Sequence, residues 1–213
     1  MRRISLTRIA ALTLSIAMLL TACSAPGTGG GSKGSDPAAN SGETTYKTEL
    51  NVAINANPPS MDPHGINSNT VGGIGMHIYE PLFSLNANYE PVPVLAEGYT
   101  VSDDGLVYTI TLRQGVKFHN GEEMTSEDVK YSLERCIANP GVNYNYLIIE
   151  SITCDDDYTV TIKTSAPFNA LLYRLSLDAA SIICKSADTS AEEFNKTPVG
   201  TGPFKFVSWE PGG

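Results

Sequence analysis

A short alternating segment constrains the fold of this chain of 213 residues more than any other feature. Tyr108, Ile110 and Leu112 alternate with polar residues, and this period of two predicts a strand with one buried face. Residues 103–105 (Asp-Asp-Gly) before the strand and Gly115 after it favour turns. With 41% hydrophobic and 17% charged residues, the chain has the composition of a globular protein.

A helix is predicted to begin at Thr125, after a His-Asn-Gly turn at residues 119–121. Asp128 stands three positions after Thr125, which is close to a capping box. The Asn-Pro-Gly sequence at residues 139–141 ends the helix. Its core face is formed by apolar residues at helical spacing, namely Val129, Leu133, Cys136 and Ile137.

Further strands and helices are predicted on both sides of this region. Alternating apolar residues predict strands at residues 50–54, 158–163 and 204–207. Helical spacing predicts helices at residues 71–83 and 169–177. The strands and helices mix without strict alternation, so the pattern alone leaves the fold class open between α/β and α+β.

The first residues have the pattern of an export signal. Arg2, Arg3 and Arg8 supply a positive start, and residues 9–20 form an apolar run that is too short to span a membrane as a helix. Cys23 follows Leu-Thr-Ala, a sequence that resembles the bacterial lipobox. An ordinary secretory signal with an incidental cysteine is the alternative.

The lipobox reading divides the N-terminal part of the chain into two segments. Residues 1–22 are predicted to be a lipoprotein signal peptide, and Cys23 is predicted to carry the lipid after cleavage. Residues 23–47 are rich in Gly, Ser, Pro, Ala and Thr and predict a flexible tether. We therefore expect an extracytoplasmic protein that is lipid-anchored at the outer face of the plasma membrane or in the periplasm.

Charge and residue spacing argue against nucleic-acid binding and against a metal site. The formal net charge is −9, with no basic cluster that could bind phosphates. His64, His77 and His119 lack metal-ligand spacing, and a structural role for His64 competes with a metal role. Asp155–Asp157 lack the other residues of a calcium loop and are interpreted as a turn. No cofactor is expected.

The cysteines after Cys23 leave the disulfide question open. Three cysteines remain, namely Cys136, Cys154 and Cys184, so at most one bridge can form among them. Disulfides persist in the extracytoplasmic compartment that the export signal predicts. A Cys136–Cys154 bridge is possible, whereas the place of Cys136 on an apolar helix face favours simple burial.

The strand-to-helix region also resembles a known family. Residues 106–121 (LVYTITLRQGVKFHNG) and 124–135 (MTSEDVKYSLER) resemble the signature region of family 5 extracellular solute-binding proteins, the dipeptide-, oligopeptide- and nickel-binding components of ABC importers. Four other segments agree with the family in order and spacing: residues 61–64 (MDPH), 78–83 (IYEPLF), 93–97 (PVLAE) and 198–204 (PVGTGPF).

The resemblance implies an α/β, periplasmic-binding-protein-like receptor with two lobes and an inserted subdomain. Residues 48–79 and 166–213 would belong to an incomplete first lobe, and residues 80–165 would form the inserted subdomain. Family members are usually more than twice as long, so we expect the second lobe to be missing from this chain, and with it the acid that pairs with the α-amino group of a peptide. Half a cleft cannot close on its ligand.

The same resemblance singles out five ligand-binding candidates. Asn67, Ser68 and Asn69 occupy positions where peptide-binding relatives offer backbone groups to an extended peptide, although they would also serve as polar caps of the next helix. Tyr144 and Tyr146 fall where such relatives place an aromatic side chain near the ligand, and packing within the inserted subdomain is the alternative.

The resulting prediction is a monomeric substrate-binding lipoprotein, not an enzyme, that hands peptides or a similar small solute to an ABC permease and its ATPase. A lipoprotein receptor for signalling peptides without import is one alternative. A secreted hydrolase is another, although the chain shows no nucleophile elbow and no P-loop.

Overall fold

The computed structural model describes residues 49–210, and residues 51–210 lie within one compact unit. The predicted signal peptide, the predicted lipidation site Cys23 and the whole of the predicted tether lie outside the described residues. Within the described range, no helix is long and apolar enough to cross a membrane.

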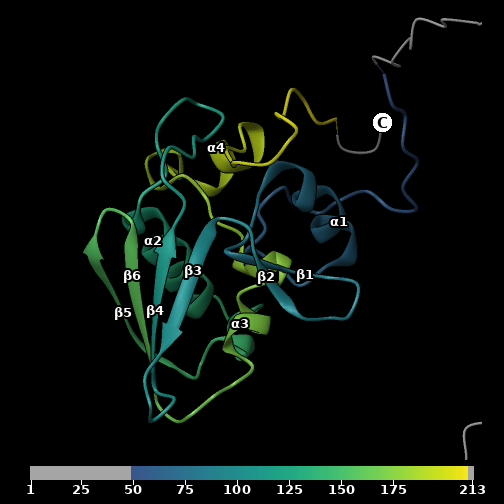
Figure 1. The fold of residues 1–213 in the computed structure, drawn as a ribbon. Coiled ribbons are helices and arrows are strands. Elements are labelled where there is room, and N and C mark those ends of the chain that lie inside the picture. The colour runs from purple at the N-terminus through teal and green to yellow at the C-terminus, as the bar shows by residue number, and fades with distance from the viewer. Residues whose placement is uncertain (1–48, 211–213) are drawn as a thin grey trace, which may run out of the picture. The chain divides into compact units, whose positions relative to one another are not determined.

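A four-stranded antiparallel sheet forms the largest element of the fold (Figure 1). Its strands are β3 (Ala96–Val101), β4 (Val107–Leu112), β6 (Thr159–Thr164) and β5 (Ile149–Asp156), in that spatial order. Val107–Leu112 and Thr159–Thr164 confirm two predicted strands, and each buries alternate residues. Direct pairing of Ile110 with Val160 fixes the register, so the apolar side chains of both strands share one face.

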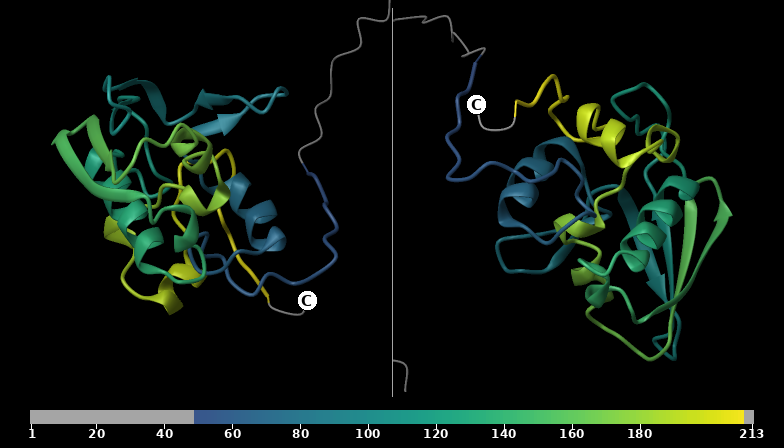
Figure 2. Two further views of the ribbon diagram at one scale, coloured as in Figure 1. Left: turned by 90° about the horizontal axis from the view of Figure 1, so that it is seen from below. Right: turned by 180° about the vertical axis from the view of Figure 1, so that it is seen from behind.

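Helix α2 (Ser126–Ala138) covers the apolar face of this sheet, as two further views show (Figure 2). The helix begins where the capping residues predict, because the Asp128 carboxylate accepts a hydrogen bond of 3.0 Å from the Thr125 backbone N–H. Val129, Leu133 and Cys136 are completely buried, which confirms the predicted core face. Asn139 caps the C-terminal end.

The remaining elements are short and flank the sheet. They are helices α1 (Asn69–Ile78), α3 (Leu171–Arg174) and α4 (Ala191–Lys196), the hairpin of β1 (Phe83–Leu85) and β2 (Pro91–Pro93), and three 3₁₀ turns, η1 (Asn143–Asn145), η2 (Asp178–Ala180) and η3 (Lys185–Ala187). One core, which includes Leu82, Tyr146 and Leu175, joins β1, α3 and η2 to the sheet, whereas Ile78 of α1 and Phe194 of α4 belong to a second, smaller cluster.

Two predicted strands are absent from the structure. Leu50, Val52 and Ile54 are exposed and form no strand, and the segment with Phe204 and Val207 is likewise exposed and irregular. A strand needs a hydrogen-bonded neighbour to persist, and among residues 49–210 neither segment is paired in a sheet. The alternating sequence pattern indicated a tendency to form strands, but these two segments form none.

Both predicted flanking helices differ from the structure. The helix predicted at 71–83 spans Asn69–Ile78, because Pro81 disfavours helical geometry in the residue before it. The helix predicted at 169–177 shrinks to Leu171–Arg174, after which the Ser176 and Leu177 amides bond three residues back rather than four.

Strand β5 was not predicted, and it contains two of the aspartates that were interpreted as a turn. Asp155 and Asp156 lie in the strand, and the chain turns at residues 157–158 instead. Two irregularities in the pairing of β5 with β6 disturb its side-chain alternation, which removed the signal that identifies a strand.

Gly200 and Gly202 attach the last described segment to the end of α1. The Gly202 N–H donates to the Ile78 carbonyl oxygen at 2.9 Å, and His119 accepts and donates hydrogen bonds on the other side of this segment. A Cβ atom at Gly200 would lie 2.1 Å from the Ile78 oxygen. Only glycine permits so close an approach of two backbones.

Candidate functional site

The predicted ligand segment forms an exposed ledge, here defined as residues 66–69, at the start of α1. Asn67 and Asn69 are exposed and Ser68 is half-buried. Ser68 occupies the capping position of α1 with extended backbone geometry, but its side chain makes no capping hydrogen bond. The Ser68 side chain is therefore not used as a cap of the helix that follows it.

Tyr144 lies against this ledge although it is 77 positions away in the chain. The Asn67 side-chain amide donates to the Tyr144 hydroxyl at 2.5 Å, and the Tyr144 side chain is 57% exposed. Tyr144 belongs to η1, which leads from the end of α2 toward β5. The structure thus brings together two candidates that the sequence places in separate regions.

Tyr146 lies in a different environment from Tyr144. Its side chain is completely buried in the main core, and its hydroxyl donates to the Arg174 carbonyl oxygen at 3.3 Å. Burial raises the pKa of Tyr146 well above its usual value. This location corresponds to the packing role that was the alternative for this residue.

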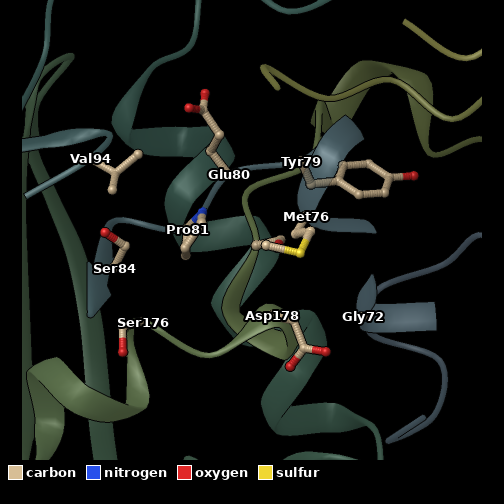
Figure 3. A pocket seen from close by; sticks show the side chains of 10 residues that line it. Gly72, Met76, Tyr79, Glu80, Pro81, Ser84, Val94, Ser176 and Asp178 are labelled. Atoms are coloured by element: carbon tan, nitrogen blue, oxygen red, sulfur yellow. The ribbon is translucent and has the colours of Figure 1, made fainter. Parts of the chain in front are cut away.

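Two open clefts border α1. One, of about 380 Å³, includes Asn69 of the ledge and is lined by Ala53, Ile54, Asn55, Asn69, Thr70 and Gly73. The other, of about 430 Å³, lies between α1 and η2, where Met76, Glu80 and Asp178 surround it (Figure 3). No basic side chain lines the second cleft, so it presents two carboxylates among mainly apolar surface.

A buried ion-pair network supports the turn before the ledge. Arg135 of α2 donates to both carboxylate oxygens of Asp62, at 2.7 and 2.6 Å, and its Nε lies 2.8 Å from Asp188. Its guanidinium also stacks 5.2 Å from the Phe194 ring centroid. Although burial opposes ionisation, the hydrogen bonds and charge of Arg135 lower the pKa of Asp62.

His64 belongs to the same turn, and its surroundings are those of a structural residue. It is fully buried, and its Nε2 lies 2.8 Å from the Ser181 carbonyl oxygen, which requires the tautomer with a proton on Nε2. Burial lowers the pKa of His64 to about 4. Among residues 49–210, no group of three His, Cys, Asp or Glu side chains could hold a metal ion.

The cysteines within the described range are free thiols. Cys136 and Cys184 are buried and Cys154 is half-buried, so the possible Cys136–Cys154 bridge does not form. The Cys136 thiol instead donates to the Ala179 carbonyl oxygen at 2.8 Å. Its position inside the helix–sheet interface agrees with the alternative of simple burial.

Sequence reasoning missed the residues that hold the ledge in place. Arg135, Asn139 and Asp188 were not predicted to support a binding site, yet Arg135 and Asn139 bond to the turn that contains Asp62 and His64. A single sequence offers no signal that pairs an aspartate with an arginine 73 positions later. Only the folded chain reveals that they meet.

Comparisons with known proteins agree with this architecture. Residues 90–213 match the family model described as "Bacterial extracellular solute-binding proteins, family 5 Middle". The chain is 39% identical over 163 residues to the glutathione-binding protein GsiB of Salmonella typhimurium and 36% identical over 162 residues to that of Escherichia coli K12. Each alignment covers 74% of this chain and 32% of the relative, so the chain spans about a third of the length of these proteins.

Solved structures give the same result. The Helicobacter pylori periplasmic binding protein DppA, in complex with the peptide STSA, matches 73% of this chain and 36% of its own with a TM-score of 0.65 and 33% identity. MoaA from A. tumefaciens R10, in complex with mannopinic acid, matches 73% of this chain and 34% of its own with a TM-score of 0.68 and 28% identity. The α/β fold is therefore that of periplasmic binding proteins, and the chain belongs to the family 5 bacterial extracellular solute-binding proteins.

Proposed function

We propose that this protein captures a peptide or a similar small solute outside the cytoplasm and delivers it to an ABC permease and its ATPase. The observation that carries the proposal is the exposed polar ledge at residues 66–69, which contacts the exposed Tyr144. An exposed segment of this kind can offer backbone groups to an extended peptide, and the tyrosine adds apolar area with a polar tip. The names of the relatives, which bind glutathione or a peptide, point to the same solute class.

Binding by the protein encoded in the complete reading frame tests this proposal. We expect calorimetric titration to show saturable binding of glutathione or of the tetrapeptide Ser-Thr-Ser-Ala, without turnover of either. Tyr144→Ala should weaken binding about tenfold, because it removes an aromatic contact of the order of 1 kcal/mol. Tyr89→Ala is the matched control, since Tyr89 is also an exposed tyrosine but lies in the β1–β2 hairpin. Equal affinities for the two variants would remove Tyr144 from the site.

The lipid anchor belongs to the same proposal. Support comes from the positive start, the short apolar run and Cys23 directly after Leu-Thr-Ala. Acylation of Cys23 would hold the folded unit at the outer face of the plasma membrane or in the periplasm through a tether at residues 23–47. Cys23→Ala should move the protein from the membrane fraction to the soluble fraction, and a variant that stays with membranes would contradict the anchor.

A further inference from the structure

We propose that Asn139 and Arg135, at the end of helix α2, are positioning residues that hold the solute-binding ledge in its binding geometry. This inference rests on the proposed function, because it assigns a purpose to contacts beneath the proposed site. Neither side chain belongs to the ledge itself. Both act on residues 62–65, the buried turn that leads directly into it.

Asn139 holds the two peptide units immediately before the ledge. Its side-chain amide donates to the carbonyl oxygens of His64 at 2.8 Å and Gly65 at 3.2 Å. Its Oδ1 accepts from the Gly141 N–H at 2.9 Å, which fixes the rotamer of the amide. One side chain therefore ties the end of α2 to the entrance of the ledge, through both of its amide donors and its oxygen acceptor.

Arg135 supplies a second attachment at the other end of the same turn. Its guanidinium forms a bidentate pair with the Asp62 carboxylate. This pair fixes the orientation of Asp62 as well as its position, because two parallel hydrogen bonds resist rotation. The Asp62 carboxylate also accepts a hydrogen bond from the His64 N–H at 2.9 Å, so the ion pair is linked to the backbone of the turn. With anchors at residue 62 and at residues 64–65, the turn cannot pivot about a single contact.

The close approach of the two chains supports a fixed geometry. A Cβ atom at Gly141 would lie 3.1 Å from the Gly65 oxygen and 3.8 Å from the Ile66 Cα. The loop after α2 thus lies directly against the first residue of the ledge, and Tyr144 follows three residues later. The end of α2 therefore supplies both the support of the ledge and its aromatic neighbour.

The test measures ledge order and solute affinity in the protein encoded by the complete reading frame. In Asn139→Ala, we expect the ¹⁵N order parameters of Asn67 and Ser68 to fall from about 0.85 to below about 0.6. The dissociation constant for glutathione or Ser-Thr-Ser-Ala should rise about tenfold. Asn139→Asp keeps the acceptor for Gly141 but loses both donors, so it should give the same result if the alanine variant fails to fold.

Ser126→Ala is the matched control because it removes a buried hydrogen bond at the opposite end of the same helix. The Ser126 hydroxyl donates to the Asp156 carbonyl oxygen at the first residue of α2, whereas Asn139 caps the last turn. Wild-type order and affinity are expected in this control. A ledge that stays rigid in both Asn139 variants, or that loosens equally in Ser126→Ala, would overturn the inference.

The two proposals fail in distinguishable ways. If the wild-type protein binds neither peptide, the proposed function fails whatever the order parameters show. If the wild type binds and the Asn139 variants loosen the ledge without losing affinity, the positioning role fails and the proposed function stands.

Discussion

Residues 80–165 and the segments on either side of them use the same kind of sequence pattern with opposite results. In the central region, Tyr108, Ile110 and Leu112 alternate with polar residues and all three are buried. In the N-terminal flanking segment, Leu50 and Val52 belong to a similar alternating pattern, yet these residues are 77% and 72% exposed. Alternation was therefore a sufficient signal in one region and an insufficient one in the other.

The difference lies in where the partners of each strand come from. In the central sheet, β3, β4, β5 and β6 pair with one another, and α2 from the same region covers them. The flanking segments have no paired strand among the described residues, so they form no sheet of their own, although Phe206 packs partly against the cluster that contains Ile78 and Phe194. A local pattern reports which face a strand would bury, whereas pairing depends on distant chain.

The largest expected effect comes from the link between the two regions. Arg135→Ala should destabilise the protein by about 4 kcal/mol, because it leaves the buried Asp62 and the half-buried Asp188 carboxylates without their cation. Urea unfolding measures the loss, and Lys163→Ala is the control because its ion pair with Glu150 is exposed. A loss no greater than that of the control would show that the regions do not depend on this link.

Matched truncations of apolar side chains test the comparison directly. Leu133→Ala should cost about 3 kcal/mol, because Leu133 is completely buried between α2 and the sheet. Val207→Ala should change the free energy of unfolding by less than about 0.5 kcal/mol, since the side chain is mostly in solvent. Similar losses for the two variants, measured by urea unfolding, would mean that the flanking segment is packed after all.

Acid should weaken the flanking turn through His64. Because the pKa of His64 is lowered to about 4 from its ordinary value near 6.5, its contribution is complete above pH 6.5 and is lost as the pH falls toward 4. Between pH 7.5 and pH 5, this histidine should remove about 2 kcal/mol of stability. The pKa of Asp62 is also lowered, so its contribution is lost only at more acid pH.

The histidine effect is isolated by comparing pH profiles. Urea unfolding at pH 7.5 and pH 5 should show a steeper loss for the wild type than for His64→Gln, by about the same 2 kcal/mol. Parallel profiles for the two proteins would show that His64 titrates alike in the folded and unfolded states.

The smallest expected effect lies at the start of α2. Asp128→Ala removes the acceptor of the Thr125 N–H and should cost about 1 kcal/mol. Its neighbour Glu127, which is exposed and forms a surface ion pair with Lys185, is the control and should change little when replaced by alanine. Thermal unfolding separates the two, and equal midpoints would remove the capping interaction as a determinant.

Much of the central region could be predicted from the sequence because its signals are local. Thr125 and Asp128 mark the start of α2, and alternation marks β4 and β6. Strand β5 was not predicted because its irregular pairing with β6 disturbs the alternation of its side chains. The candidate site was predicted only in outline. The resemblance indicated Asn67 and Tyr144, but no pattern showed that they touch or that α2 supports them.

The free thiols have a consequence for the stability of this protein. Burial raises the pKa of Cys136 to about 12, so almost none of it is the reactive thiolate at neutral pH. Cys184 is also buried, and none of the three described cysteines pairs with another. The fold of the described unit therefore does not depend on a disulfide among these three cysteines, so a reducing agent should leave its unfolding midpoint unchanged.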